Sequence, residues 1–108
     1  MAESVKQYFE EDLPGKLEAH PELAEKIGAV YQFNLTGEGG GEWVVDLVQN
    51  QVRAGEDAEA KCTVTVDAAD FLKIVSGALN AQMAFMSGKL KIGGDLSLAM
   101  KLGELLKT

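Results

Sequence analysis

Apolar and polar residues alternate along three short segments of the chain, and this two-residue period constrains the fold more than any other feature. The alternation runs through residues 31–36 (YQFNLT), 42–49 (EWVVDLVQ) and 61–66 (KCTVTV). Successive side chains of a β-strand point to opposite faces of a sheet, so each segment is predicted to be a strand with one apolar face. Residues 52–54 and 89–92 are predicted to add two short strands. Helices are then expected to cover the apolar face of the sheet.

Before the first strand, the apolar residues follow the period of a helix. Residues 2–27 carry them at steps of three and four, and Pro14-Gly15 is expected to break the first helix. Pro21 suits the opening turn of the next helix, and Gly28 suits its left-handed end. The glycine-rich residues 37–41 (GEGGG) then join the first two strands, which predicts a β-hairpin.

Three polar residues mark the starts of later helices. Asp67, Asn80 and Asp95 each precede an apolar helical segment, and their side-chain oxygens can accept hydrogen bonds from the free amides of a first turn. Gly93-Gly94 is expected to turn the chain before the last helix. The order of elements predicts one α+β domain over residues 1–108, with helices packed on one sheet.

The residue types that carry chemistry are scarce. Cys62 and His20 are the only cysteine and histidine, which excludes an internal disulfide framework and a multi-cysteine metal site and fits a reducing compartment. The net charge of −7 disfavours nucleic acid as a partner. Cys62 lies on the apolar side of a strand, where a thiol is usually inert. His20 and an undetected carboxylate pair leave an enzyme as an open alternative, but no arrangement of residues stands out as catalytic. We therefore expect no enzyme activity, no cofactor and no metal.

The last third of the chain has more apolar residues than a two-layer domain needs for its own packing. In the terminal helix, Leu96 and Met100 form an i, i+4 pair outside the main apolar face, and a helix apolar on two sides is expected to be buried on two sides. Three interpretations are open: ordinary core, a homodimer or partner interface, and a pocket for an apolar ligand to which methionines can adapt. The main apolar face holds Leu98, Ala99, Leu102, Leu105 and Leu106.

Four segments occur in a characteristic order and spacing: WVVD at residues 43–46, KCTVTVDAADF at 61–71, AFMSGKLKIGGDL at 84–96 and AMKL at 99–102. Together they resemble the sterol carrier protein 2 domain family. The resemblance implies a five-stranded, mostly antiparallel sheet covered on one face by helices, which enclose an apolar tunnel. It also implies non-catalytic intracellular binding and transfer of lipids, such as fatty acyl chains, acyl-CoA, sterols or phospholipids.

The resemblance also carries over a set of ligand-binding residues between the sheet and the later helices. The expected partner is a lipid or another apolar small molecule. The alternative is a protein-interaction module or a homodimer that uses the second apolar face of the terminal helix. The expected ligand-binding residues are Phe71, Val75, Met83, Phe85, Met86, Leu96 and Met100, with Trp43 and Val45 approaching from the sheet.

Two departures from the family bear on where the protein acts. Glu10, Glu11 and Asp12 lie close to the lone Lys6, which argues against docking of the first helix on anionic membranes. We therefore expect at most transient membrane contact. The sequence ends in LKT rather than a peroxisomal targeting tripeptide, so a cytoplasmic location is expected.

Overall fold

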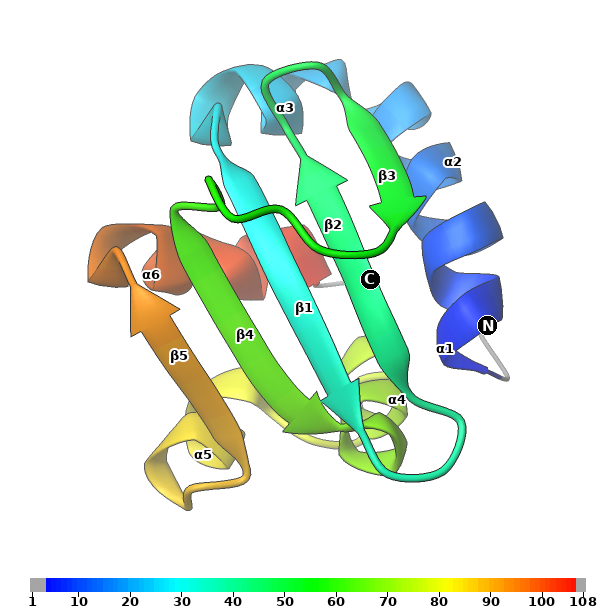
Figure 1. Cartoon of the computed structure of the whole chain (residues 1–108), viewed down its shortest axis with the longest axis vertical. Helices are drawn as coiled ribbons and strands as arrows, with labels where there is room; N and C mark the ends of the chain where they lie inside the picture. Colours follow the sequence, from blue (N-terminus) through cyan, green and yellow to red (C-terminus); the bar gives the residue numbers. More distant parts are fainter. Residues whose placement is uncertain (1–3, 107–108) are drawn as a thin grey trace.

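The structure, a computed structural model, describes residues 4–106, apart from the side chains of Leu102 and Glu104. The strands are β1 Val30–Thr36, β2 Gly41–Asp46, β3 Gln51–Ala54, β4 Cys62–Asp67 and β5 Leu90–Gly94. They form a five-stranded sheet in the order β3-β2-β1-β4-β5, and the described helices lie on one face of it (Figure 1). β1 and β4 run parallel, whereas the other neighbouring strands run antiparallel. The predicted α+β class with a mostly antiparallel sheet is confirmed.

The sheet presents an apolar face to the helices because its strands alternate as predicted. Tyr31 and Phe33 on β1 are fully buried on this face. The ring of Phe9 stacks on Trp43 and on Phe71, with centroids 5.2 Å and 5.3 Å apart. These rings join the N-terminal helices, the sheet and the helix that carries Phe71 into one core.

The other face of the sheet is covered in part by the loop at residues 55–61. Gln32 accepts a hydrogen bond from the backbone N–H of Asp57 at 2.7 Å and donates one to the carbonyl of Gly55 at 3.1 Å. These bonds satisfy the buried carboxamide of Gln32 and hold the loop in place. Val44, the ladder partner of Gln32 on the face opposite the helices, is also buried.

The N-terminal helices run on without the predicted break at Pro14-Gly15, so that prediction is wrong. The N–H of Leu13 donates to the carbonyl of Tyr8, five residues back, and this wider turn gives a proline ring the room that a regular α-helix denies it. The helix is interrupted at His20 instead. Gly28 ends the next helix with a φ of 57°, as predicted. The elements are α1 Val5–Gln7, the π-helical turn η1 Tyr8–Asp12, α2 Leu13–Ala19 and α3 Pro21–Ile27.

Three further helices follow β4 in the chain: α4 Ala68–Val75, α5 Ala81–Met86 and, after β5, α6 Leu96–Leu106. Each begins at its predicted cap. The side chains of Asp67, Asn80 and Asp95 accept hydrogen bonds from the backbone N–H groups two residues on, at 2.8 to 3.0 Å. Short-range hydrogen bonding thus fixes where these helices start.

The predicted turn at Gly93-Gly94 lies at Gly94, because both glycines still pair with β4, opposite Thr63 and Cys62. The chain leaves the sheet at Gly94, where φ is 90° and a Cβ would collide with the carbonyl oxygen of Lys61. The N–H of Asp95 donates to that same carbonyl at 2.9 Å. The first turn of α6 is thereby fixed beside β4.

Candidate functional site

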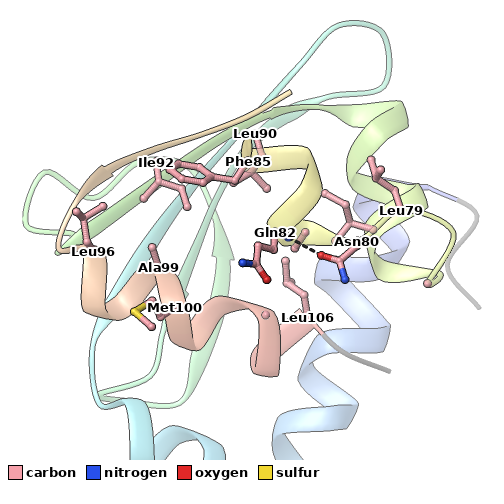
Figure 2. A pocket seen from close by; sticks show the side chains of 14 residues that line it. Leu79, Asn80, Gln82, Phe85, Leu90, Ile92, Leu96, Ala99, Met100 and Leu106 are labelled. Atoms are coloured by element: carbon pink, nitrogen blue, oxygen red, sulfur yellow. Dashed lines mark hydrogen bonds between the residues drawn. The ribbon is translucent and has the colours of Figure 1, made fainter. Parts of the chain in front are cut away.

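A cavity of about 810 Å³ lies between the β5 edge of the sheet and the C-terminal helices. Side chains from β5, α5 and α6 project into it (Figure 2). Its lining comes entirely from the last third of the chain. The lining residues are Ile74, Gly77, Leu79, Asn80, Ala81, Gln82, Phe85, Leu90, Ile92, Leu96, Ala99, Met100, Gly103 and Leu106.

β5 supplies one wall because alternate residues of this edge strand face the helices. Leu90 and Ile92 are two positions apart and both line the cavity, whereas Lys91 between them is exposed. The short helix α5 lies against β5, and Ala84 is its buried residue. Phe85 extends from α5 toward β5 (Figure 2). α5 therefore buries one small side chain, while its large apolar side chains Met83, Phe85 and Met86 stay exposed.

α6 supplies the opposite wall and has two different sides. Leu98 and Leu105 are buried in the core. Leu96, Met100 and Gly103 follow one another at steps of four and three and line the cavity. Leu102 was predicted on the core side, and its side chain lies outside the described part of the structure.

Two hydrogen bonds, one buried and one partly buried, hold the core side of α6 to the rest of the protein. The hydroxyl of Tyr31 on β1 donates to the carbonyl of Leu98 at 2.6 Å. The ammonium of Lys16 on α2 donates to the carbonyl of Leu105 at 2.7 Å, and partial burial lowers the pKa of this lysine. The wall that α6 forms is therefore attached near both of its ends.

The prediction that Leu96 and Met100 are buried is wrong for the chain by itself. Leu96 is 64% exposed and Met100 is 86% exposed, and Phe85 across the cavity is 46% exposed. α6 uses its opposite side to pack on the core, so within residues 4–106 nothing else covers this pair. Exposed apolar side chains gathered around a cavity are typical of a surface that binds an apolar ligand or a partner.

Two lining residues have polar side chains, and both come from the start of α5. The Oδ1 atom of Asn80 accepts hydrogen bonds from the backbone N–H groups of Gln82 at 2.8 Å and Met83 at 3.3 Å. The carboxamide of Gln82 lies in the space between α5 and α6 (Figure 2). Among the described lining residues there is no ionisable side chain. The cavity therefore combines apolar walls with two carboxamides, of which that of Gln82 can both donate to and accept from a ligand.

The structure divides the nine predicted ligand-binding residues into three groups. Phe85, Leu96 and Met100 line the cavity. Met83 and Met86 lie on α5 outside the lining and are 66% and 77% exposed. The remaining four are packed in the core and are not among the lining residues: Phe71 and Val75 on α4, and Trp43 and Val45 on β2.

Sequence reasoning missed several lining residues. Leu90 and Ile92 follow the same alternation that predicted β5, so the signal for them was present. Ile74, Leu79 and Leu106 carry no local signal that separates a cavity wall from ordinary core. Only the arrangement of α4, α5 and α6 around the sheet edge makes that distinction.

The residues considered for catalysis lie elsewhere. Cys62 is fully buried in the core, and burial, with a smaller contribution from Asp95, raises the pKa of its thiol to about 11. The thiol is therefore protonated near neutral pH. His20 is exposed, with Nδ1 3.0 Å from a carboxylate oxygen of Glu22. Neither residue belongs to the cavity lining.

Residues 8–107 match the family model described as the SCP-2 sterol transfer family. The chain belongs to this family. It is 42% identical over 100 residues to sterol carrier protein 2 of Homo sapiens, covering 87% of this chain and 18% of that protein. It is 46% identical over 88 residues to hydroxysteroid dehydrogenase-like protein 2 of Rattus norvegicus, covering 79% of this chain and 17% of that protein. The chain thus spans about a fifth of the length of such relatives.

A solved structure of a palmitated protein matches this chain over nearly its whole length. The solution structure of palmitated SCP2L2 from Aedes aegypti matches with a TM-score of 0.76 and 33% sequence identity, covering 97% of this chain and 96% of that one. The fold of this chain is therefore that of sterol carrier protein 2 domains. Within the described residues, no helix is long and apolar enough to cross a membrane.

Proposed function

We propose that this SCP-2 domain binds and transfers apolar ligands without chemistry, with the ligand lying in the cavity between β5, α5 and α6. The observation that supports this most directly is the cavity itself, which has apolar walls and leaves Leu96 and Met100 exposed at its edge. Its volume of about 810 Å³ lies within the range of small-molecule sites. The palmitated relative from Aedes aegypti supports an acyl chain as one ligand.

Ligand binding would be favoured because it removes exposed apolar side chains of the domain from water. Covering the exposed fractions of Phe85, Leu96 and Met100 is worth about 4 kcal/mol, at roughly 2 kcal/mol for a fully buried apolar side chain. Each ligand methylene removed from water adds about 0.8 kcal/mol. Fatty acyl chains, acyl-CoA, sterols and phospholipids all satisfy this requirement, because the walls ask only for apolar surface.

The enclosed tunnel expected for the family is part of this proposal. Leu96 and Met100 approach the cavity from α6 and Phe85 approaches it from α5, so a chain between the two helices would be covered from both sides. Gln82 would then meet the polar end of a ligand, such as a sterol hydroxyl or a carboxyl group. The ligand itself completes the enclosure.

A thermal-shift experiment on delipidated protein tests the proposal. Palmitate, palmitoyl-CoA and cholesterol are added separately, and native mass spectrometry records whether one ligand binds per chain. A ligand present at 100 times its Kd stabilises the fold by about 2.7 kcal/mol, which corresponds to a rise in Tm of roughly 10 °C for a domain of this size. No shift and no bound mass with any of the three ligands would refute the proposal.

The exposed apolar side chains also support a second candidate, a protein-interaction module or homodimer. Met83, Met86 and Met100 are each at least 66% exposed, and a partner helix can cover such a surface. This alternative predicts a stable oligomer in sedimentation experiments with no bound small molecule. A monomer that retains lipid through purification would exclude it.

A further inference from the structure

The hydroxyl of Tyr8 is buried in the protein without a hydrogen-bond partner. Tyr8 is only 5% exposed, and no group among the described residues bonds to its hydroxyl oxygen. Buried hydroxyls are normally hydrogen-bonded, because burying one without a partner costs free energy. Tyr8 also opens η1, and π-helical turns are rare and occur frequently at functional sites. The Tyr8 hydroxyl is therefore free to bond to a ligand without breaking a bond within the protein.

The other tyrosine of the chain shows how this core satisfies a buried hydroxyl. Tyr31 is fully buried, and its hydroxyl donates to the carbonyl of Leu98 at 2.6 Å. Burial is the main reason that the pKa of each tyrosine lies above its usual range, so both hydroxyls are protonated near neutral pH. The two tyrosines thus share burial and protonation, and they differ in that only the hydroxyl of Tyr31 has a partner.

Tyr8 lies near the cavity although it is not one of the lining residues. Its ring meets the ring of Phe71 on α4 edge to face, with centroids 5.3 Å apart. Ile74 lines the cavity and follows Phe71 by three residues on the same helix, about 4.5 Å along the helix axis. Less than one turn of α4 therefore separates the cavity wall from the residue that Tyr8 contacts.

α6 brings the buried end of the cavity to the N-terminal helices. Leu106 lines the cavity and is 2% exposed, whereas Leu96 at the start of α6 lines it and is exposed. The neighbouring Leu105 accepts a hydrogen bond from Lys16 on α2, so this end of α6 lies against the N-terminal helices (Figure 2). The cavity therefore runs from an exposed end at Leu96 to a buried end at Leu106, beside the helices that carry Tyr8.

The surroundings of the Tyr8 hydroxyl favour a neutral ligand oxygen over a charged one. The carboxylate of Asp12, four residues on, lies close enough to add to the rise in the pKa of Tyr8, yet it does not bond to the hydroxyl. Burial and this negative charge both disfavour an anion at the same place. A hydroxyl or ketone oxygen, by contrast, can accept a hydrogen bond from Tyr8 without bringing a charge.

We propose that the cavity selects acyl chains that carry a neutral oxygen at the end remote from the carboxyl group, and that Tyr8 is the specificity-determining residue. The chain passes between Ile74 and Leu106 and places its oxygen against the Tyr8 hydroxyl. The carboxyl group stays away from this buried end. The inference rests on the proposed function and names a class of ligand within it, which is a chain with an oxygen at its far end rather than a plain hydrocarbon chain.

Binding of palmitate and 16-hydroxypalmitate, measured by isothermal titration on delipidated protein, tests the proposal. The two ligands differ by one hydroxyl group. In the Tyr8→Phe variant the Kd for 16-hydroxypalmitate should rise about tenfold, because the ligand hydroxyl is left buried without a partner. The Kd for palmitate should not change. Tyr31→Phe is the matched control, and it should change both Kd values by the same factor because its lost bond acts on α6.

Thermal unfolding of the same ligand-free proteins provides a second measurement. Tyr8→Phe removes a hydroxyl that has no partner in the protein, so its Tm should equal or exceed that of the wild type. Tyr31→Phe removes a bonded hydroxyl, so its Tm should fall. A lower Tm for Tyr8→Phe would show that the ligand-free protein already satisfies this hydroxyl, for example with a trapped water molecule, and would overturn the proposal.

The binding data can also overturn the proposal. An unchanged Kd for 16-hydroxypalmitate in Tyr8→Phe, or an equal loss for both ligands, would do so. If this variant does not fold, nuclear Overhauser effects in the wild type decide: contacts between the Tyr8 ring and the terminal methylene of 16-hydroxypalmitate support the proposal, and their absence rejects it. Failure of the wild type to bind either ligand would reject the proposed function, whereas binding without discrimination by Tyr8 rejects this inference alone.

Discussion

Gly103 is the position where we expect stability and ligand binding to respond in opposite directions. It lies in α6 on the cavity side, and a Cβ built there would meet no heavy atom within 4 Å. Its φ is outside the left-handed region that favours glycine. A leucine at this position would therefore fit the helix, with its side chain in the space that we assign to the ligand.

The substitution Gly103→Leu has two calculable effects. Glycine inside a helix is about 0.8 kcal/mol less favourable than leucine, so the ligand-free variant gains this amount, which raises Tm by about 3–4 °C for a chain of this length. The added side chain displaces about three ligand methylenes. At about 0.8 kcal/mol each, the loss is about 2.4 kcal/mol, or roughly 50-fold in Kd.

Gly15→Leu is the matched control. Gly15 also lies inside a helix, α2, its added Cβ would meet nothing within 4 Å, and it does not line the cavity. We expect a similar rise in Tm, measured by calorimetry on delipidated protein, and an unchanged Kd for palmitate, measured by isothermal titration. If Gly103→Leu binds palmitate as tightly as the control does, the ligand does not lie along α6 and the reasoning is refuted.

Three further predictions follow from single side chains. Tyr31→Phe removes the buried 2.6 Å hydrogen bond to Leu98 and should lower the free energy of unfolding by about 1–2 kcal/mol, measured by urea denaturation; an unchanged value would contradict this anchor for α6. Hydrogen bonds from the hydroxyl and the N–H of Ser97 lower the pKa of Asp95 in the folded state. The charged Asp95 carboxylate therefore stabilises the fold fully above its unfolded-state pKa of about 3.9, and this stabilisation is lost as the pH falls through the lower folded-state pKa. The stability difference between the wild type and Asp95→Asn should therefore narrow in acid, and a constant difference would contradict it. Burial raises the pKa of the Cys62 thiol to about 11. The rate at which a disulfide reagent labels Cys62 at mildly basic pH should therefore be limited by unfolding, and ligand should slow it. Labelling as fast as that of a free thiol would show that Cys62 is accessible.

Local signals predicted most of the fold. Alternation predicted the strands, and the three caps Asp67, Asn80 and Asp95 predicted helix starts, because both depend on residues within a few positions of one another. The predicted helix break at Pro14-Gly15 was wrong because a π-helical turn accommodates the proline. Amino-acid composition does not predict such a turn. Gly94 ends β5 later than predicted because its ladder partner on β4 lies some thirty residues earlier in the chain.

The site was predictable only in outline. The apolar second side of α6 predicted Leu96 and Met100, and both line the cavity. Phe71 and Met86 show why the rest was not predictable: both are apolar residues on helices, yet one is fully buried in the core and the other is 77% exposed outside the cavity. Which side of a short helix faces a cavity depends on how α4 and α5 pack at the sheet edge, and periodicity alone does not contain that information.

Intermolecular nuclear Overhauser effects between palmitate and methyl-labelled protein test the central claim most directly. If palmitate lies in the cavity, its acyl chain should contact the methyl groups of Ile92, Leu96 and Leu106. The acyl chain should make no contact with Val45, which is fully buried in the core on β2. Contacts to Val45 without contacts to Ile92, or a bound acyl chain that contacts none of the three cavity methyls, would contradict it.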